Sequence, residues 1–227
     1  MLSLKKNFGF ALIGNLGYAA SQYIILLIFI KLYSVDDVGI FVYAGAFTTP
    51  LMMALEMQLR NFYITDQDND FSLSNYFTFR VLTNTLGVIA LVLSALYLRP
   101  EYFGVILVVT LIKVFESQLD LIYGIYQKNH RLDYVAYSRI LRGIIAVIVV
   151  AIITLLLKDI LYSLIAYLFT WVVLYFFYER RQVVSRGFIK ANEMRLRLPS
   201  WVKMKPLLIL CIPMFFSIFI DKYYLNY

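Results

Sequence analysis

The sequence has little cysteine, histidine or charge. Cys211 is the only cysteine among 227 residues and lies in an apolar run, which excludes an intrachain disulfide and leaves cysteine redox chemistry unsupported. His130 is the only histidine, and its polar neighbours favour a solvated loop position over a metal-ligand role. The chain has no GxxxxGK[ST] phosphate loop and no HExxH motif. A nucleotide-driven pump is therefore disfavoured, and we expect no enzyme active site, no metal and no bound cofactor.

Charged residues make up only 15% of the chain and hydrophobic residues 62%, whereas soluble proteins have roughly a quarter charged residues. This composition predicts an all-α, polytopic membrane protein. Six apolar runs approach or exceed the roughly 18–20 residues that span a bilayer. The first is too long for a secretory signal peptide. A shorter seventh run, Leu207–Ile220, contains Pro213. The six predicted spans are Phe8–Leu32, Val38–Leu59, Val81–Leu98, Tyr102–Tyr126, Ile140–Leu157 and Ile160–Tyr178.

The distribution of Lys and Arg predicts the orientation of these spans. The first, third and fifth connections carry only Lys31, Arg99 and Lys158, whereas the N-terminus and the even connections are more basic. Because positive residues accumulate on the cytoplasmic side, the N-terminus is predicted to face the cytoplasm. The same pattern explains why the chain has more Lys and Arg (21) than Asp and Glu (14), so no nucleic-acid partner is expected. The odd connections are also very short, which predicts three tight helical hairpins closed on the outer side.

The runs divide the chain into three predicted parts. Residues 1–180 form a six-helix transmembrane lobe, residues 181–205 a basic cytoplasmic linker, and residues 206–227 the first helix of a second, incomplete lobe. The stretch Phe188–Leu196 is amphipathic and suits a helix lying on anionic lipid, although a plain basic linker explains it equally well. Asp66, Asp68 and Asp70 are interpreted as a solvated turn.

Three charged residues interrupt the fourth apolar run. Lys113, Glu116 and Asp120 are spaced by three and four residues, so they share one helical face. A charge in hydrocarbon costs roughly 2.5–3.5 kcal/mol even on lenient scales, so this face is predicted to line a polar cavity. A self-contained Lys113–Glu116 ion pair that only specifies packing is the alternative. The net negative trio requires a further cation, a proton or solvent access.

Two further polar pairs lie in the first two spans. Glu56 and Arg60 are four residues apart, the order that suits an ion pair within one helix, and they could also extend toward water. Asn15 and Gln22 are seven residues apart and therefore share a face. Polar amides hydrogen-bond neighbouring membrane helices, so this pair serves either helix packing or contact with a substrate.

A loose pattern of residues runs through about the first 80 positions, and the hairpin spacing agrees with it. Its residues are Asn15, Tyr18 and Gln22, then Lys31–Leu32, Val38–Phe41, Ala44, Ala46 and Pro50, then Leu59, Arg60, Asp66, Tyr76 and Arg80. In these residues the chain resembles the opening of bacterial Wzx-type polysaccharide flippases, within the multidrug/oligosaccharidyl-lipid/polysaccharide exporter superfamily. The resemblance implies a place in the bacterial cytoplasmic membrane, two six-helix lobes around a central cavity, and transport of an undecaprenyl-pyrophosphate-linked oligosaccharide to the outer leaflet by alternating access. It also implies that this chain is the N-terminal portion of a longer transporter or a truncated product.

On that resemblance Lys113 would contact the pyrophosphate or an acidic sugar, while Glu116 and Asp120 set its charge or couple transport to protons or sodium. Arg60, Arg80 and Arg142 would capture phosphates at the cytoplasmic ends. Membrane lipids and the polysaccharide polymerase machinery are the further partners expected. Two alternatives remain: a cation-coupled multidrug exporter of the same superfamily, and a membrane-bound enzyme of polysaccharide assembly. The tiny outer connections count against the enzyme, which would need a large catalytic loop.

Overall fold

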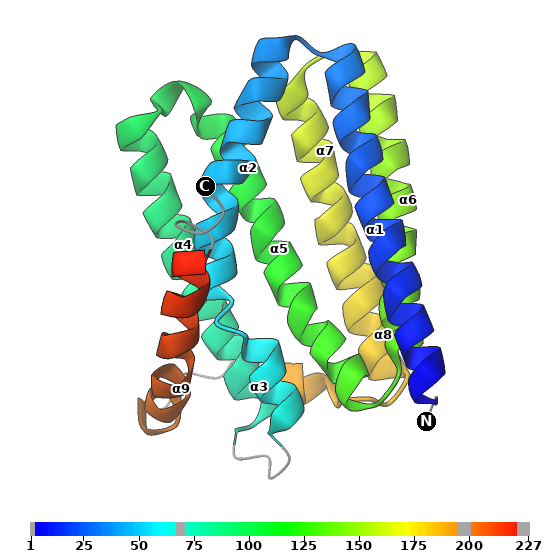
Figure 1. Cartoon of the computed structure of the whole chain (residues 1–227), viewed down its shortest axis with the longest axis vertical. Helices are drawn as coiled ribbons and strands as arrows, with labels where there is room; N and C mark the ends of the chain where they lie inside the picture. The colour runs from blue at the N-terminus through cyan, green and yellow to red at the C-terminus, as the bar shows by residue number, and fades with distance from the viewer. Residues whose placement is uncertain (1–2, 67–70, 195–200, 222–227) are drawn as a thin grey trace.

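The computed structural model describes residues 3–66, 71–194 and 201–221, which form a bundle of long helices without a β-strand in those ranges (Figure 1). Short 3-10 turns occur at η1 (Pro100–Tyr102) and η3 (Ala191–Met194), and η2 (Leu174–Glu179) is a π-helix. The α-helices are α1 (Leu4–Leu32), α2 (Val35–Leu55), α3 (Leu59–Thr65), α4 (Leu73–Leu98), α5 (Phe103–Lys128), α6 (Leu132–Leu157), α7 (Ile160–Val173), α8 (Arg180–Ser185) and α9 (Trp201–Ile220).

Long apolar helices with lipid-facing surfaces dominate the described chain. Five helical stretches are long and apolar enough to cross a membrane: Leu4–Leu32, Val35–Thr65, Leu73–Leu98, Leu132–Leu157 and Ile160–Ser185. Their outward faces expose large apolar side chains such as Leu93 (63% exposed) and Phe169 (66% exposed). Water would penalise such surface, whereas lipid does not. The prediction of an all-α, polytopic membrane protein is therefore confirmed.

Helix α5 differs from the five apolar stretches because it carries the charged trio. It is also 26 residues long, and it packs against α2, α3, α4, α6 and α7. Figure 1 shows it in green at the centre of the bundle. Packing on all sides explains how the helix can hold charges that lipid would disfavour. The predicted fourth span is thus a central helix whose polar face meets protein.

Three short connections lie at one end of the bundle, at the top of Figure 1. They join α1 to α2, α4 to α5 and α6 to α7, as predicted from their length. The Ser34 and Asp159 side chains cap the helices that follow them, accepting from Asp37 N at 3.1 Å and Leu161 N at 2.8 Å. The Tyr33 hydroxyl donates to the Asp159 carbonyl at 2.9 Å and lies 2.7 Å from Ser163 Oγ. These hydrogen bonds hold the first and third hairpins together.

Helices α1 and α6 pack closely because small residues face each other along their contact. A Cβ added at Gly14 would lie 2.7 Å from the Ala136 Cα, and one at Gly143 would lie 2.6 Å from Ser21 Oγ. Glycine therefore lets the two backbones approach, as small residues commonly do between membrane helices.

We expect Gly14→Ala to lower the free energy of unfolding by about 1–3 kcal/mol, because the methyl group would overlap the α6 backbone. Gly9→Ala is the matched control, since a Cβ there meets nothing within 4 Å. The control should be neutral or stabilising, because alanine favours helix. Thermal unfolding in detergent measures both variants. Equal stability of the two would show that the α1–α6 contact does not depend on the glycine.

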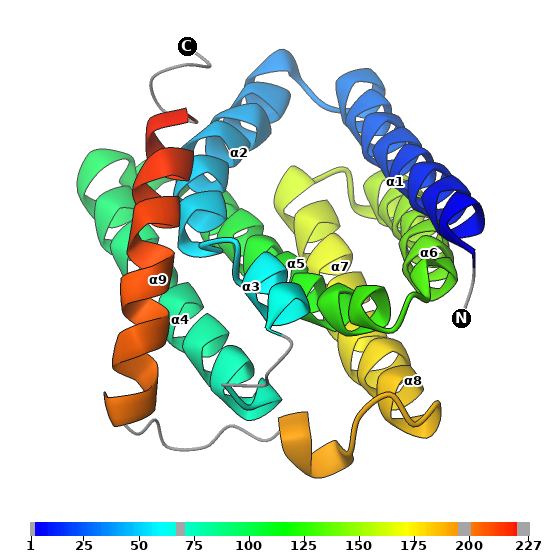
Figure 2. The ribbon, with the colours of Figure 1, turned by 60° about the horizontal axis from the view of Figure 1, so that its bottom comes forward.

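The second predicted span is interrupted. Helix α2 ends at Leu55, and α3 starts at Leu59. Between them, Met57 (φ 49°) and Gln58 (φ 55°) both adopt left-handed backbone. Consecutive left-handed residues other than glycine cost roughly 1–2 kcal/mol each, so tertiary contacts must hold this break. The prediction of one continuous helix over Val38–Leu59 is wrong at its end, because the chain breaks after Leu55 and α3 runs in another direction from α2 (Figure 2).

The third hairpin continues past its predicted end. The π-helix η2 (Leu174–Glu179) follows α7 directly, and α8 continues the helix to Ser185. The chain reverses at Gly187 (φ 73°) and packs back on the base of the bundle. There Phe188 meets the Tyr126 and Tyr134 rings at 5.3 and 5.7 Å, and Ile189 is buried. The predicted amphipathic helix over Phe188–Leu196 is wrong where it is described: only η3 forms, because the apolar side chains bury against protein. Residues 195–196 lie outside the described ranges.

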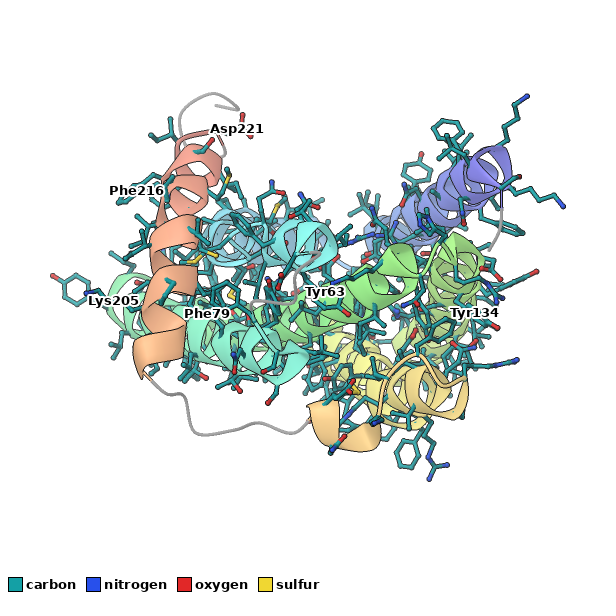
Figure 3. The ribbon with its side chains drawn as sticks, turned by 90° about the horizontal axis from the view of Figure 1, so that it is seen from below. Tyr63, Phe79, Tyr134, Lys205, Phe216 and Asp221 are labelled. Carbon is teal, nitrogen blue, oxygen red and sulfur yellow. The ribbon has the colours of Figure 1, made fainter. Side chains whose placement is uncertain are left out.

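Helix α9 packs against α2 and α4. It begins at Trp201, inside the predicted linker, and its Leu207 and Cys211 side chains are fully buried. Seen from the base, α9 with Lys205 and Phe216 lies on the opposite side of the bundle from Tyr134 (Figure 3). The division into a lobe, a linker and a further helix remains a prediction. Of the Asp66–Asp70 turn, only Asp66 is described, and it accepts from the Tyr76 hydroxyl at 2.9 Å.

Candidate functional site

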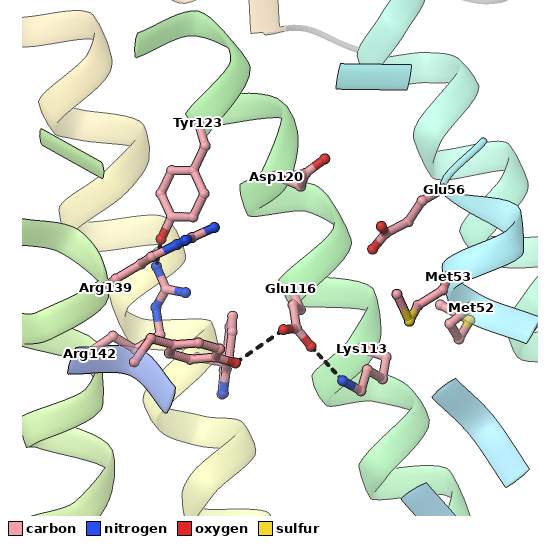
Figure 4. Close-up of a pocket in the computed structure, with 11 residues that line it drawn as sticks. Met52, Met53, Glu56, Lys113, Glu116, Asp120, Tyr123, Arg139 and Arg142 are labelled. Carbon is pink, nitrogen blue, oxygen red and sulfur yellow. Dashed lines mark hydrogen bonds and ion pairs between the residues drawn. The ribbon is translucent and has the colours of Figure 1, made fainter. Parts of the chain in front are cut away.

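A polar pocket of about 170 Å³ lies at the centre of the helices (Figure 4). Its walls come from α1, α2, α5, α6 and α7, together with Glu56 just after α2. All three members of the predicted trio line it. The lining residues are Tyr18, Met52, Met53, Glu56, Lys113, Glu116, Asp120, Tyr123, Arg139, Arg142 and Trp171. Three acidic and three basic side chains thus share one small space inside a membrane protein, which is the expensive arrangement that usually accompanies a function.

Lys113 and Glu116 form an ion pair on the wall of this pocket. Lys113 Nζ lies 2.8 Å from Glu116 Oε2, and the Tyr18 hydroxyl donates to Glu116 Oε1 at 3.1 Å (Figure 4). The two side chains remain 27% and 32% exposed. The pair is therefore neither buried in packing nor free in solvent. It lies open to the pocket while Tyr18 connects it to α1.

Asp120 has the cationic partners that the sequence required but did not identify. Arg60 Nη1 lies 3.0 Å from Asp120 Oδ1, and Arg80 Nη2 lies 3.7 Å from Oδ2. Arg60 also donates to the Gln127 amide oxygen, and Arg80 donates to the Glu56 carbonyl at 3.1 Å. Two predicted phosphate contacts thus converge on one carboxylate of α5. Arg80 is fully buried, so its predicted role at the membrane surface does not match its position.

Glu56 and Arg60 do not form the helical pair that was predicted. The break at Met57 and Gln58 separates them, and Arg60 turns to Asp120 instead. The prediction is wrong because the left-handed residues end the helical spacing on which it depended. The Glu56 carboxylate has no hydrogen bond or ion pair with the described residues, and it borders the pocket. The Glu56 carboxylate therefore makes no direct contact with a cation, and the nearby buried Arg80 guanidinium, which donates to the Glu56 carbonyl, stabilises its charge from a distance.

A second hollow of about 430 Å³ adjoins the pocket toward the base. It shares Met53, Glu56 and Asp120 with the pocket and adds Gln58, Arg60, Asn61, Ile218 and Asp221. The shared residues make the two spaces neighbours along the break between α2 and α3. Charged and polar side chains thus line both of two adjacent spaces, from the pocket to the residues at the end of α9.

Arg142 belongs to a buried network rather than to a cytoplasmic surface. Its Nη2 lies 3.2 Å from Glu179 Oε1 and 3.0 Å from Ser138 Oγ, and it also contacts the Tyr123 hydroxyl. The guanidinium lies 4.4 Å from the Trp171 ring centre. The two charged side chains are 4% and 1% exposed. Glu179, the last residue of the π-helix η2, is positioned for this contact by that helix. The predicted capture of incoming phosphate at the membrane surface does not fit this placement.

The two amides predicted on the first helix lie outside the pocket wall. Asn15 is exposed. Gln22 Nε2 donates to the Tyr167 hydroxyl at 2.9 Å, so this amide connects α1 to α7. The sequence left open whether these amides serve helix packing or substrate contact. Gln22 serves helix packing, because its partner is a side chain of α7. Tyr18, between them in sequence, is the α1 residue that reaches the pocket.

Sequence reasoning did not identify Arg139 as a site residue. It lines the pocket and lies 5.2 Å from the Tyr123 ring centre, and it forms no ion pair or hydrogen bond with the described residues. Its spacing of three from Arg142 was a usable signal, because both then share a helical face. The basic residues around it instead indicated a cytoplasmic connection. In residues 3–66, 71–194 and 201–221, no group of three His, Cys, Asp or Glu side chains could hold a metal ion.

The chain is similar to one protein of assigned role. It is 29% identical over 143 residues to the capsular polysaccharide biosynthesis protein CapF of Staphylococcus aureus. The matched stretch covers 63% of this chain and 36% of that relative, so the chain spans little more than a third of its length. No known protein-family model matches the chain, and no solved structure does. The similarity therefore connects a multi-pass membrane protein with capsular polysaccharide biosynthesis.

Proposed function

We propose that this protein is a membrane transporter, not an enzyme, that flips undecaprenyl-pyrophosphate-linked oligosaccharide across the bacterial cytoplasmic membrane for polysaccharide biosynthesis. The observation that carries the proposal is the charged pocket inside a membrane bundle, in a chain similar to a capsular polysaccharide protein. Such a lipid has a large polar, anionic head and an apolar tail. Its head needs a polar route through the membrane, which the pocket and its neighbouring hollow supply in part.

The pocket offers specific groups to such a head. Arg139 lines it without a carboxylate partner, and a guanidinium binds phosphate oxygens in a bidentate geometry. Lys113 contributes a second cation that Glu116 holds in place. A second lobe, in a longer chain or a partner, would complete the cavity in the Wzx-like arrangement that the sequence resembles. Alternating access would then move the head while the tail stays in lipid.

Glu56 is the residue we propose for coupling to protons or sodium. Its carboxylate borders both polar spaces and forms no hydrogen bond or ion pair with the described residues, although the Arg80 charge is nearby. A carboxylate in that situation gains most from binding a proton or a cation. In the proposed orientation the N-terminus is cytoplasmic, and the polymerase machinery would receive the flipped glycan outside.

Deleting the gene and locating the lipid-linked glycan tests the proposed function. We expect surface polysaccharide to fall and lipid-linked oligosaccharide to accumulate on the cytoplasmic leaflet, where an impermeant oxidant added outside cannot reach it. Accumulation on the outer leaflet would instead indicate a polymerase step. Normal polysaccharide together with increased dye sensitivity would support the multidrug exporter and overturn the proposal. Restoring the gene provides the control.

A further inference from the structure

A separate groove lies on the other side of α5 from the charged pocket. It has a volume of about 600 Å³, and its walls come from α4, α5, η2 and η3. On α5 it is lined by Phe115 and Gln118, whereas Lys113, Glu116 and Asp120 line the pocket. At 3.6 residues per turn, these two sets fall on roughly opposite faces of the helix. The groove is therefore no extension of the transport pocket.

The wall of this groove is mostly apolar and aromatic. Phe77 and Val81 come from α4, and Phe115 faces them from α5. The Phe115 ring lies 6.4 Å from the Phe176 ring, edge to face, so that α5 and η2 are in contact across the groove floor. An apolar channel of this kind, on the outside of a membrane bundle, accommodates an acyl chain better than a polar ligand.

Two polar groups in the groove lack partners. Gln118 is only 7% exposed, yet its amide forms no hydrogen bond with the described residues. Its amide atoms are not fully buried, so they are accessible from the groove and can hydrogen-bond a ligand that lies in it. Arg180 stands at the basal end, with its guanidinium 5.8 Å from the Phe176 ring centre and no carboxylate partner in the described ranges. Arg181, next to it, likewise lies over Phe177.

Arg180 also belongs to the wall of an adjoining hollow that Arg181 and Ser185 line. The basal end of the groove thus presents two neighbouring guanidinium groups without protein counterions. Ser117 on α5 donates to Asn84 on α4 at 3.1 Å, so in these antiparallel helices Phe77 and Val81 lie on the basal side of Gln118 and Phe115 lies on its other side. The groove therefore combines two cations, an amide and apolar surface, which suit the phosphate, the ester oxygens and the hydrocarbon of a phospholipid.

We propose that this groove binds one anionic phospholipid. Arg180 and Arg181 bind its headgroup at the basal surface, and Gln118 donates a hydrogen bond to an ester oxygen. Phe77 and Val81 pack beside its glycerol backbone, and one acyl chain extends along Phe115. A net negative headgroup is selected because the two guanidinium groups have no other counterion, whereas a zwitterionic lipid carries its own compensating cation. The site rests on the membrane location of the bundle and is independent of the proposed transport activity.

Electron paramagnetic resonance with spin-labelled lipids tests this site on the 227-residue chain in phosphatidylcholine vesicles. We expect spin-labelled phosphatidylglycerol to be bound about tenfold more tightly than phosphatidylcholine, the effect of one charge-assisted hydrogen bond. Arg180→Gln should remove this preference. Arg186→Gln is the matched control, because Arg186 is exposed at the same base, lies over the Tyr134 ring and is not part of the groove wall.

A second variant separates a built site from general attraction to basic residues. Val81→Trp keeps every charge but fills the groove, so it too should abolish the preference for phosphatidylglycerol. Circular dichroism confirms that each variant stays folded. The proposal is overturned if Arg186→Gln reduces the preference as much as Arg180→Gln does, if Val81→Trp leaves it unchanged, or if millimolar inorganic phosphate displaces the labelled lipid.

Discussion

Replacing Glu179 with Gln is expected to lower the free energy of unfolding by about 3–5 kcal/mol, because it leaves the buried Arg142 guanidinium without its counterion. The Arg142 and Glu179 side chains are 4% and 1% exposed, so water cannot take over the lost interaction. Contacts with Ser138 and Tyr123 remain, and they satisfy only part of the guanidinium. Thermal unfolding in detergent, followed by circular dichroism, measures the effect.

Two controls sharpen this result. Glu101→Gln removes the same charge from an exposed pair with Arg99, whose side chains are about half exposed, and should leave the unfolding temperature unchanged. Replacing Arg142 and Glu179 together by Met removes both charges and should recover most of the stability, because desolvation of the ion pair is no longer required. If Glu179→Gln behaves like Glu101→Gln, the buried network does not stabilise the base of the bundle.

Arg139→Gln is expected to reduce polysaccharide export by tenfold or more while leaving stability nearly unchanged. The guanidinium lines the pocket without an ion pair to the described residues, so its loss removes no internal charge partner. A charge-assisted hydrogen bond to a phosphate contributes roughly 1.5–3 kcal/mol, which corresponds to about a 10- to 100-fold change. Surface polysaccharide is measured in a gene-deleted strain that carries each variant on the chromosome.

Arg186→Gln serves as the control for Arg139→Gln, because Arg186 also lies over a tyrosine ring but far from the pocket wall. Its export should match that of the unaltered protein. Arg139→Lys keeps the charge but not the bidentate geometry, so an intermediate loss is expected. Full export by Arg139→Gln at equal protein level would remove this residue from the proposed phosphate contact.

Helix placement followed from the sequence because apolar run length and charge position are strong local signals. The short connections at Ser34 and Asp159 likewise followed from length, and their capping side chains agree with it. The break after Leu55 could not be predicted, because Met57 and Gln58 are not residue types that usually mark a left-handed turn, as glycine does. Only tertiary contacts, such as Arg80 with the Glu56 carbonyl, account for it.

The polar face of α5 could also be predicted from the sequence, because spacing alone sets which residues share a helical face. The side chains that pair with this face could not be predicted. Asp120 meets Arg60 and Arg80 from two other helices, and these contacts depend on how α3 and α4 pack against α5. The predicted location of Arg142 at the cytoplasmic surface was wrong for a related reason. The π-helix η2 brings Glu179 inward to Arg142, and the spacing of apolar residues does not predict a π-helix.

The central claim is that Lys113 and Glu116 line a transport route rather than serve only as a packing contact, and exchanging the two residues tests it most directly. Lys113→Glu combined with Glu116→Lys keeps an ion pair three residues apart on the same helix and removes the carboxylate that accepts from Tyr18, so folding should be retained at the cost of that one hydrogen bond. The exchange moves the cation to another position on the pocket wall. We predict normal protein levels and a loss of glycan export, with lipid-linked oligosaccharide accumulating on the cytoplasmic leaflet. Full export by the exchanged pair would contradict the account, because it would show that the pair contributes packing alone.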